Sequence, residues 1–202
     1  MAARPISRRL GLASGTRATP SGNALRAAVL GANDGLVSNL CLVMGVAGAD
    51  PGREVVILAG LAALLAGSLS MALGEWISVR SSTEAYERQR AELEDVPRVP
   101  GAPRQPEPQT HFDAWVAAVT SFLTFSVGAI IPLIPWFFAE GTTAVVLSAV
   151  FSGAALFAAG AIITRYTGRS ILFSGTRMLL IGAAAAAVTY FLGKIIGIST
   201  GV

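Results

Sequence analysis

Five long apolar runs dominate this sequence of 202 residues. Because an α-helix rises about 1.5 Å per residue, about 20 consecutive apolar residues span the roughly 30 Å hydrocarbon core of a bilayer. Each run reaches that length, and the runs occupy residues 25–48, 55–79, 115–138, 144–163 and 178–198. The mean hydropathy of +0.62 and the low share of charged residues, 13%, exclude an ordinary soluble domain of this size. The sequence therefore predicts an all-α integral membrane protein with five transmembrane helices.

The basic residues are distributed unevenly about these runs. If the N-terminus is cytoplasmic, only Arg53 and Lys194 fall on the opposite side of the membrane. Lys and Arg near the ends of spans resist translocation, so this bias predicts the N-terminus inside and the C-terminus outside. A nucleic-acid binder would need a basic face interleaved with aromatic residues, whereas these basic residues lie at the ends of the runs. Membrane lipid is the expected environment, and nucleic acid is not an expected partner.

The order of the runs divides the chain into four segments. They are a disordered basic N-terminal tail (1–23), a transmembrane hairpin of helices one and two (24–80), a cytoplasmic segment with a helix extension and a Pro-rich linker (81–113), and transmembrane helices three to five (114–198). Short connections after the first and third runs predict that helices one and two, and helices three and four, are antiparallel neighbours.

Proline and glycine mark where helices continue and where they stop. Residues 81–95 contain neither, so the second helix is expected to continue into water for several turns. Five prolines within residues 97–108 predict a stiff, extended spacer. Pro132 and Pro135, inside the third run, remove backbone donors and are expected to kink or break that helix.

Two acidic residues, Asp34 and Glu75, lie well inside apolar runs. A carboxylate at such a position costs on the order of 3 kcal/mol on insertion scales, so another interaction must offset the cost. One hypothesis is that both side chains bind a passing cation. The alternative is that each is protonated and bonded to a neighbouring helix, or that Glu75 reaches the inner interface.

Helical spacing groups other polar side chains with these acids. Asp34 and Ser38 lie one turn apart on one face of the first run. The second run places a hydroxyl, a thioether, a carboxylate and a second hydroxyl on one face, at Ser68, Met71, Glu75 and Ser78. Carboxylate oxygen combined with a thioether suits a borderline transition ion better than Mg²⁺ or Ca²⁺. The pattern predicts a path for Fe²⁺ or Mn²⁺ whose metal ligands are Asp34, Met71 and Glu75.

Longer motifs surround these residues. They are Asn33-Asp-Gly-Leu-Val-Ser38, the stretch 66–79 that contains Met71 and Glu75, the stretch 120–135 with its two prolines, and the stretch 175–182. Together they resemble the vacuolar iron transporter family, and the resemblance extends over residues 25–197. It implies a homodimer of five-helix protomers that exchanges cytosolic Fe²⁺ or Mn²⁺ for protons, with a pathway near the dimer axis between the first and second helices. Asp34 and Met71 match pathway residues of that family, Glu75 matches a carboxylate of many members, and Asn33 is included in the predicted pathway.

The cytoplasmic segment departs from that family. In the iron-transporting members, as the resemblance implies, it folds into a bundle rich in Glu and Met that collects metal, and here it is shortened. Glu84 and Glu87 remain on the predicted helix extension and are candidates for cytoplasmic ion capture. The alternative is a solvated helix face on which Glu84 pairs with Arg88, one turn further on.

Three classes of function compete: a metal exporter, a membrane enzyme, and a non-transporting membrane scaffold or interaction protein with internally paired carboxyls. An enzyme is not expected, because no His lies inside a run and neither HExxH nor GxSxG occurs. Export with proton antiport is favoured, since metal and protons would compete for the same carboxylates. No permanently bound cofactor is expected, only the transported Fe²⁺ or Mn²⁺. The expected location is a bacterial-type plasma membrane, or a vacuolar or other endomembrane if the cell is eukaryotic.

Overall fold

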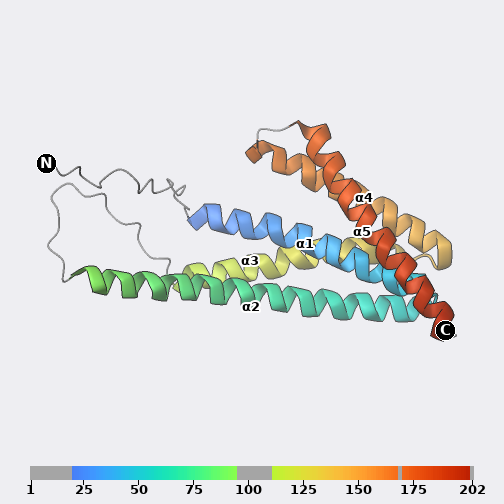
Figure 1. Cartoon of the computed structure of the whole chain (residues 1–202), viewed down its shortest axis with the longest axis horizontal. Helices are drawn as coiled ribbons and strands as arrows, with labels where there is room; N and C mark the ends of the chain where they lie inside the picture. Colours follow the sequence, from blue (N-terminus) through green and yellow to red (C-terminus); the bar gives the residue numbers. More distant parts are fainter. Residues whose placement is uncertain (1–19, 95–110, 168–169, 201–202) are drawn as a thin grey trace, which may run out of the picture.

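The computed structural model of the chain describes residues 20–94, 111–167 and 170–200, and these parts are helical apart from residues 49–52, 138–140 and 170 (Figure 1). The elements are α1 (Pro20–Gly48), α2 (Arg53–Glu94), α3 (His111–Ile130), the 3-10 helix η1 (Ile131–Phe137), α4 (Gly141–Thr167) and α5 (Ile171–Thr200). Five segments of the described chain are long and apolar enough to cross a membrane, and each contains one of the predicted runs or most of it. The predicted all-α membrane fold with five spanning helices is thereby confirmed.

The helix ends extend beyond most of the predicted runs. α1 begins at Pro20, so residues 20–23 are helical, while the rest of the predicted tail, 1–19, lies outside the described residues. Proline is well suited to the first position of a helix, because its missing N–H has no intrahelical partner there. α5 begins at Ile171, seven residues before the fifth predicted run. The predicted Pro-rich spacer at 97–108 also lies outside the described residues.

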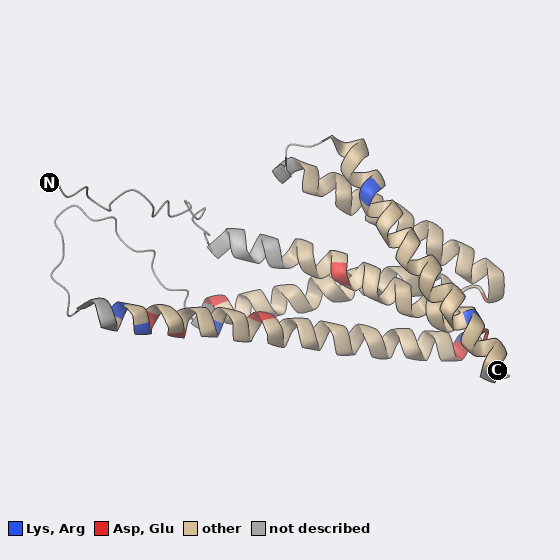
Figure 2. Cartoon of the chain, in the orientation of Figure 1, with Lys and Arg blue, Asp and Glu red and all other residues tan. Residues whose placement is uncertain are grey.

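α2 is much longer than a membrane is thick. Its 42 residues correspond to about 63 Å of helix, roughly twice the hydrocarbon core. The charged residues of α2 lie mainly at its two ends, and its last turns project past the other helices (Figure 2). The second helix thus continues without a break as far as Glu94, and its extension into water stays a prediction. We call the end of the bundle from which it projects the extension end, and the opposite end, where residues 49–52 connect α1 to α2, the turn end.

The two prolines of the third run end α3 at Ile130, as predicted, and the chain continues as η1. In a 3-10 helix each N–H donates to the carbonyl three residues earlier, so Pro132 and Pro135 leave the carbonyls of Ala129 and Pro132 without a partner. Side chains of other helices bond to both carbonyls. Asn39 Nδ2 donates to Ala129 O at 2.6 Å, and Ser148 Oγ donates to Pro132 O at 2.7 Å. The broken helix is thereby attached to α1 on one side and to α4 on the other.

α1 occupies the centre of the bundle and contacts every other element. Its first half packs closely on α3, where Gly35 lies against the backbone of Phe125. Its last turns pack equally closely on α5, where Gly45 faces Gly193. Small residues let helices approach each other in this way within a membrane. The result is a central helix that has different partners along its length.

The predicted pairing of helices three and four holds only for η1, the last part of the third run, and is wrong for α3. α4 packs on η1, α1 and α5 rather than along α3. The physical reason is the break at Pro132, because η1 carries the chain away from the axis of α3 before α4 begins. α2 packs on α1, α3 and η1, and α4 and α5 lean away from it (Figure 1).

Candidate cation pathway along α1 and α2

Asp34 lies in the membrane-spanning part of α1, and its side chain is exposed. No hydrogen bond or ion pair of its carboxylate occurs within the described part of the chain. Its backbone carbonyl accepts a hydrogen bond of 2.6 Å from Ser38 Oγ, so the hydroxyl one turn further on faces its own helix. The opposite side of α1 is held against α3 by Gly35. This crossing presents the Asp34 carboxylate on the outer surface of the protomer.

Asn33, adjacent to Asp34, is half-buried. Its Oδ1 is inaccessible and has no hydrogen-bond partner among the described residues. A buried amide oxygen without a donor is costly in a protein interior. Asn33 therefore places a hydrogen-bond acceptor next to the Asp34 carboxylate, and this acceptor is not exposed at the surface.

The four polar residues predicted to share a face of α2 do lie along one side of it, but their exposure changes along the helix. Ser68 is fully buried and donates from Oγ to Leu65 O at 3.1 Å. Met71 and Glu75 are half-buried, and Ser78 is exposed. The Glu75 carboxylate has no hydrogen bond or ion pair in the part of the chain that the structure describes. This face therefore leads from the interior of the bundle outward toward the extension end.

Contacts with α3 fix the relative depths of these residues. On α1, Gly35 lies against the backbone of Phe125. On α2, Gly67 lies against the ring of the same Phe125, and the Trp76 ring lies near that of Trp115. Asp34 is therefore level with Gly67 and its neighbour Ser68. Glu75 lies seven residues beyond Ser68, which is about 10 Å of helix, and Met71 lies between the two levels. Within one protomer, Asp34 and Glu75 occupy successive depths and not one coordination shell.

The described residues contain no group of three or more His, Cys, Asp or Glu side chains that could hold a metal ion. The predicted ligands Asp34, Met71 and Glu75 are arranged in sequence along two neighbouring helices instead. A bound cation would retain most of its water at any one of them, since one carboxylate or thioether fills only part of its coordination sphere. This arrangement suits a path of successive weak sites better than a tight resident metal site.

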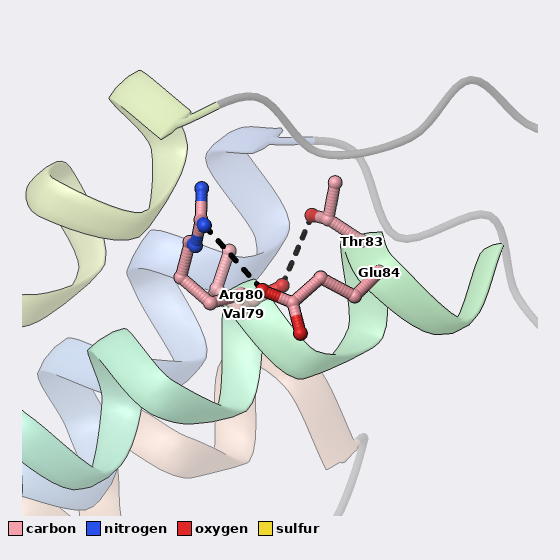
Figure 3. Close-up of polar contacts among 4 residues, drawn as sticks. All are labelled: Val79, Arg80, Thr83 and Glu84. Atoms are coloured by element: carbon pink, nitrogen blue, oxygen red, sulfur yellow. Dashed lines mark hydrogen bonds and ion pairs between the residues drawn. The ribbon is translucent and has the colours of Figure 1, made fainter. Parts of the chain in front are cut away.

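At the extension end the chain forms an interfacial cluster. The rings of Trp76 and Trp115 are 6.1 Å apart, and the Arg80 guanidinium lies over the Trp76 ring at 5.8 Å. Arg80 Nη2 also pairs with Glu84 Oε1 at 3.4 Å, while Thr83 Oγ1 donates to Val79 O at 3.0 Å (Figure 3). The side chains of Glu84 and Glu87 are exposed, so both are accessible to ions in the surrounding water. The observed partner of Glu84 is thus Arg80, one turn earlier on the helix.

Asn39 and Ser148, which hold the carbonyls released at η1, were not predicted from the sequence. A signal for them was available, because each proline frees the carbonyl three residues before it and a buried carbonyl needs a donor. The sequence does not reveal which polar residue supplies the donor, since Asn39 lies 90 residues from its partner. These residues position the bundle and are not candidates for ion binding.

The fold and this site together define a polytopic membrane protein whose two adjacent spanning helices carry carboxylates without a partner among the described residues. Comparison with known proteins agrees with this class. The chain matches the VIT family over residues 25–100 and 101–194. It is 40% identical over 175 residues to vacuolar iron transporter homolog 1 of Oryza sativa subsp. japonica, which covers 86% of this chain and 74% of that relative. It is 39% identical over 178 residues to vacuolar iron transporter homolog 1 of Arabidopsis thaliana, covering 86% of this chain and 83% of that relative.

The chain belongs to the VIT family. Members of this family are transporters and not enzymes, which confirms the expectation drawn from the sequence. The resemblance read from the motifs around Asp34 and Met71 is likewise confirmed.

Proposed function

We propose that this protein exports divalent iron or manganese from the cytoplasm in exchange for protons. The observation that carries the proposal is the exposed Asp34 carboxylate within a membrane-spanning helix, without a bonding partner among the described residues. A carboxylate placed within a membrane costs on the order of 3 kcal/mol, and a cation or proton that binds to it would offset this cost. Membership of the VIT family and the names of the plant relatives support metal as the cargo.

The depths of the residues give the proposed path an order. The extension end faces the cytoplasm, and ions collect there near Glu84 and Glu87. They then pass Glu75, Met71 and Asp34 in turn, with Asn33, Ser38, Ser68 and Ser78 as the polar lining. Because a carboxylate binds either a proton or a metal ion, a proton that arrives from the opposite side would displace the ion outward.

The proposed transporter is a homodimer in which α2 faces its counterpart. The exposed side of α2 carries small residues at every fourth position, namely Ala62, Ala66, Ser70, Gly74 and Ser78, which we call the small-residue stripe. A Cβ added at Gly74 would meet no atom of the described residues within 4 Å, so none of these residues requires glycine there. Small residues at such spacing let two membrane helices approach closely. A second copy on this stripe would enclose the half-buried Met71 and Glu75.

The protein is a membrane protein, and its proposed location follows from the direction of export. We place it in the plasma membrane of a bacterial-type cell, or in a vacuolar or other endomembrane if the cell is eukaryotic. The vacuolar designation of the plant relatives supports the second setting for a eukaryotic source. In each case the N-terminus and the extension of α2 remain in the cytoplasm.

A non-transporting scaffold is the competing hypothesis, and it requires internal partners for the two acids. Neither the Asp34 nor the Glu75 carboxylate has such a partner in the part of the chain that the structure describes. This observation favours transport over the scaffold.

The test is a flux assay in reconstituted vesicles that contain a metal-sensing dye. Fe²⁺, Mn²⁺, Zn²⁺ or Ca²⁺ is added outside under an imposed pH gradient, and initial rates are compared. The wild-type chain is expected to transport Fe²⁺ or Mn²⁺ in a manner that depends on the gradient. Asp34→Asn should lower the rate by at least about tenfold, because it removes the charge that binds the ion.

Asp50→Asn is the matched control. Asp50 lies in the turn between α1 and α2, is exposed and has a φ of 56°, a conformation that Asn also accepts. Its replacement removes the same charge without altering the proposed path, so the flux should remain at the wild-type level. Wild-type flux in Asp34→Asn, or no metal flux in the wild-type chain, would contradict the proposal.

A further inference from the structure

Arg177 is an exposed cation on the outer surface of α5, near the extension end. Exposed apolar side chains of this helix lie on both sides of it, with the exposed Thr176 immediately before it. Leu172 and Phe173 precede it and are 73% and 54% exposed, and Leu180 and Ile181 follow it and are 62% and 61% exposed. A guanidinium near the end of a membrane helix reaches the headgroup level, where an anion can pair with it.

The protein supplies no such anion within its described residues. The guanidinium lies over the ring of Phe173, 5.9 Å from its centre, and it forms no ion pair with any described carboxylate. The cation–π contact holds the side chain along the helix surface and leaves the N–H donors of the guanidinium available. An arginine held in this way can bind a phosphate group, whose oxygens accept two parallel hydrogen bonds from the guanidinium.

The position of Arg177 along α5 corresponds to the level of the lipid phosphates. Residues 178–193 contain no charged residue, and Lys194 follows them. The distance along the helix from Arg177 to Lys194 is about 25 Å, close to the thickness of the hydrocarbon core. The two cations therefore mark the two boundaries of the apolar part of α5, where long basic side chains reach the headgroups.

The surface around Arg177 is hollowed. A shallow depression of about 600 Å³ is lined by Leu172, Phe173, Thr176, Arg177, Leu180 and Ile181. α5 packs on α1 and α4 through other faces, with Gly175 and Gly182 toward α4 and Gly193 toward α1. The depression is thus open to the bilayer and combines one cation with an apolar floor.

We propose that this depression binds an anionic phospholipid of the leaflet at the extension end. Its phosphate pairs with Arg177, and one acyl chain lies along Leu180 and Ile181 toward the middle of the membrane. The charge of the arginine favours an anionic headgroup over a zwitterionic one, which carries its own cation. This inference does not depend on the proposed transport of metal, because lipid retention is measured without any flux.

The test is native mass spectrometry of the full-length protein in detergent, with dioleoyl phosphatidylglycerol or dioleoyl phosphatidylcholine added at equal concentration. The wild-type chain is expected to retain phosphatidylglycerol in preference to phosphatidylcholine. Arg177→Gln should reduce phosphatidylglycerol retention by about fivefold or more, since the charged pair is lost. Arg177→Lys, which keeps the charge but not the forked geometry, should show an intermediate loss.

Lys194→Gln is the matched control, since it removes one positive charge from the other boundary of the same helix. It should retain phosphatidylglycerol as the wild type does, and a thermal melt of each variant verifies that it is folded. Equal retention of the two lipids by the wild type, or unchanged retention in Arg177→Gln, would overturn the proposal. Displacement of the lipid by millimolar inorganic phosphate would also overturn it, because the site would then bind free anions.

Discussion

Gly35 of α1 lies directly against the backbone of Phe125 of α3, at the crossing that turns Asp34 outward. A Cβ at this position would overlap the Phe125 carbonyl, which cannot move without a shift of the helix. Gly35→Ala is therefore expected to lower the free energy of unfolding by about 1–3 kcal/mol, the usual cost of overpacking. Unfolding of the detergent-solubilised protein by added denaturing detergent, followed by circular dichroism, measures the change.

Gly74→Ala is the control for this variant, because an added Cβ there meets no atom within 4 Å in the described part of the protomer. We expect no loss of monomer stability, and a gain of a few tenths of a kcal/mol is reasonable since Ala favours helix more than Gly does. Equal effects of the two substitutions would show that the α1–α3 contact is not as close as the structure has it.

The proposed dimer predicts cross-linking along the small-residue stripe. The sequence has one cysteine, Cys41, so Cys41→Ser provides a background without thiols. In that background Ser70→Cys is expected to form a disulfide-linked dimer under mild oxidation in membranes, because Ser70 is exposed on the stripe. Val188→Cys should remain monomeric on a non-reducing gel, since Val188 is 64% exposed on α5 and faces lipid in the proposal. Preferential cross-linking through Val188→Cys would place the dimer contact on α5 instead.

The spanning helices were predictable because each depends on local properties of the chain. An apolar run of sufficient length must form a helix in a bilayer, and Pro132 and Pro135 must interrupt it, whatever the neighbouring helices are. The pairing of helices was not predictable in the same way. The short connection before α4 indicated a hairpin with α3, but η1 redirects the chain. α4 packs on α5 through close contacts such as that of Gly160 with Gly175, and these residues lie far along the chain from the connection.

The residues of the candidate site were predictable from the sequence, but their relative positions were not. A carboxylate inside an apolar run is visible in the sequence, and so is the spacing of Met71 and Glu75. The relative depth of Asp34 and Glu75 is not, because it depends on how far α1 and α2 slide along α3. Only the contacts of Gly35 and Gly67 with Phe125 fix that offset.

The hydrogen bond from Asn39 to the Ala129 carbonyl makes a separate prediction about stability. Asn39 is 1% exposed, and its bond of 2.6 Å satisfies a carbonyl that Pro132 leaves free. Asn39→Ala should destabilise the protein by about 1–3 kcal/mol, because a buried acceptor loses its donor. Ser38→Ala is the control, since the Ser38 hydroxyl is exposed and bonds only to its own helix. The same denaturing-detergent titration applies, and a loss in Ser38→Ala as large as that in Asn39→Ala would contradict the assignment.

The ion pair between the half-buried Arg80 and the exposed Glu84 allows ion capture to be distinguished from structural stabilisation. Glu84 is 63% exposed, and ion pairs of this kind contribute about 0–1 kcal/mol to stability. The double variant Glu84→Gln, Glu87→Gln should therefore have the same free energy of unfolding as the wild type. It should, however, require a higher metal concentration for half-maximal flux. An unchanged concentration dependence would show that the two glutamates form only a solvated helix face.

The separation in depth between Glu75 and Asp34 predicts different kinetic effects of the two carboxylates. Glu75 lies nearer the extension end, so an ion from the cytoplasm meets it first. Glu75→Gln should raise the apparent KM for Mn²⁺ by about fivefold or more and leave the maximal rate within about twofold, because it weakens access more than passage. Asp34→Asn should instead lower the maximal rate at saturating Mn²⁺, since the ion still reaches Glu75 but lacks its next site. Initial rates over a range of Mn²⁺ concentrations in vesicles separate these outcomes. If both variants changed KM and maximal rate alike, the two carboxylates would act as one shared site. Such a site could form only if α1 and α2 slid past each other by about 10 Å, the length of seven residues of helix.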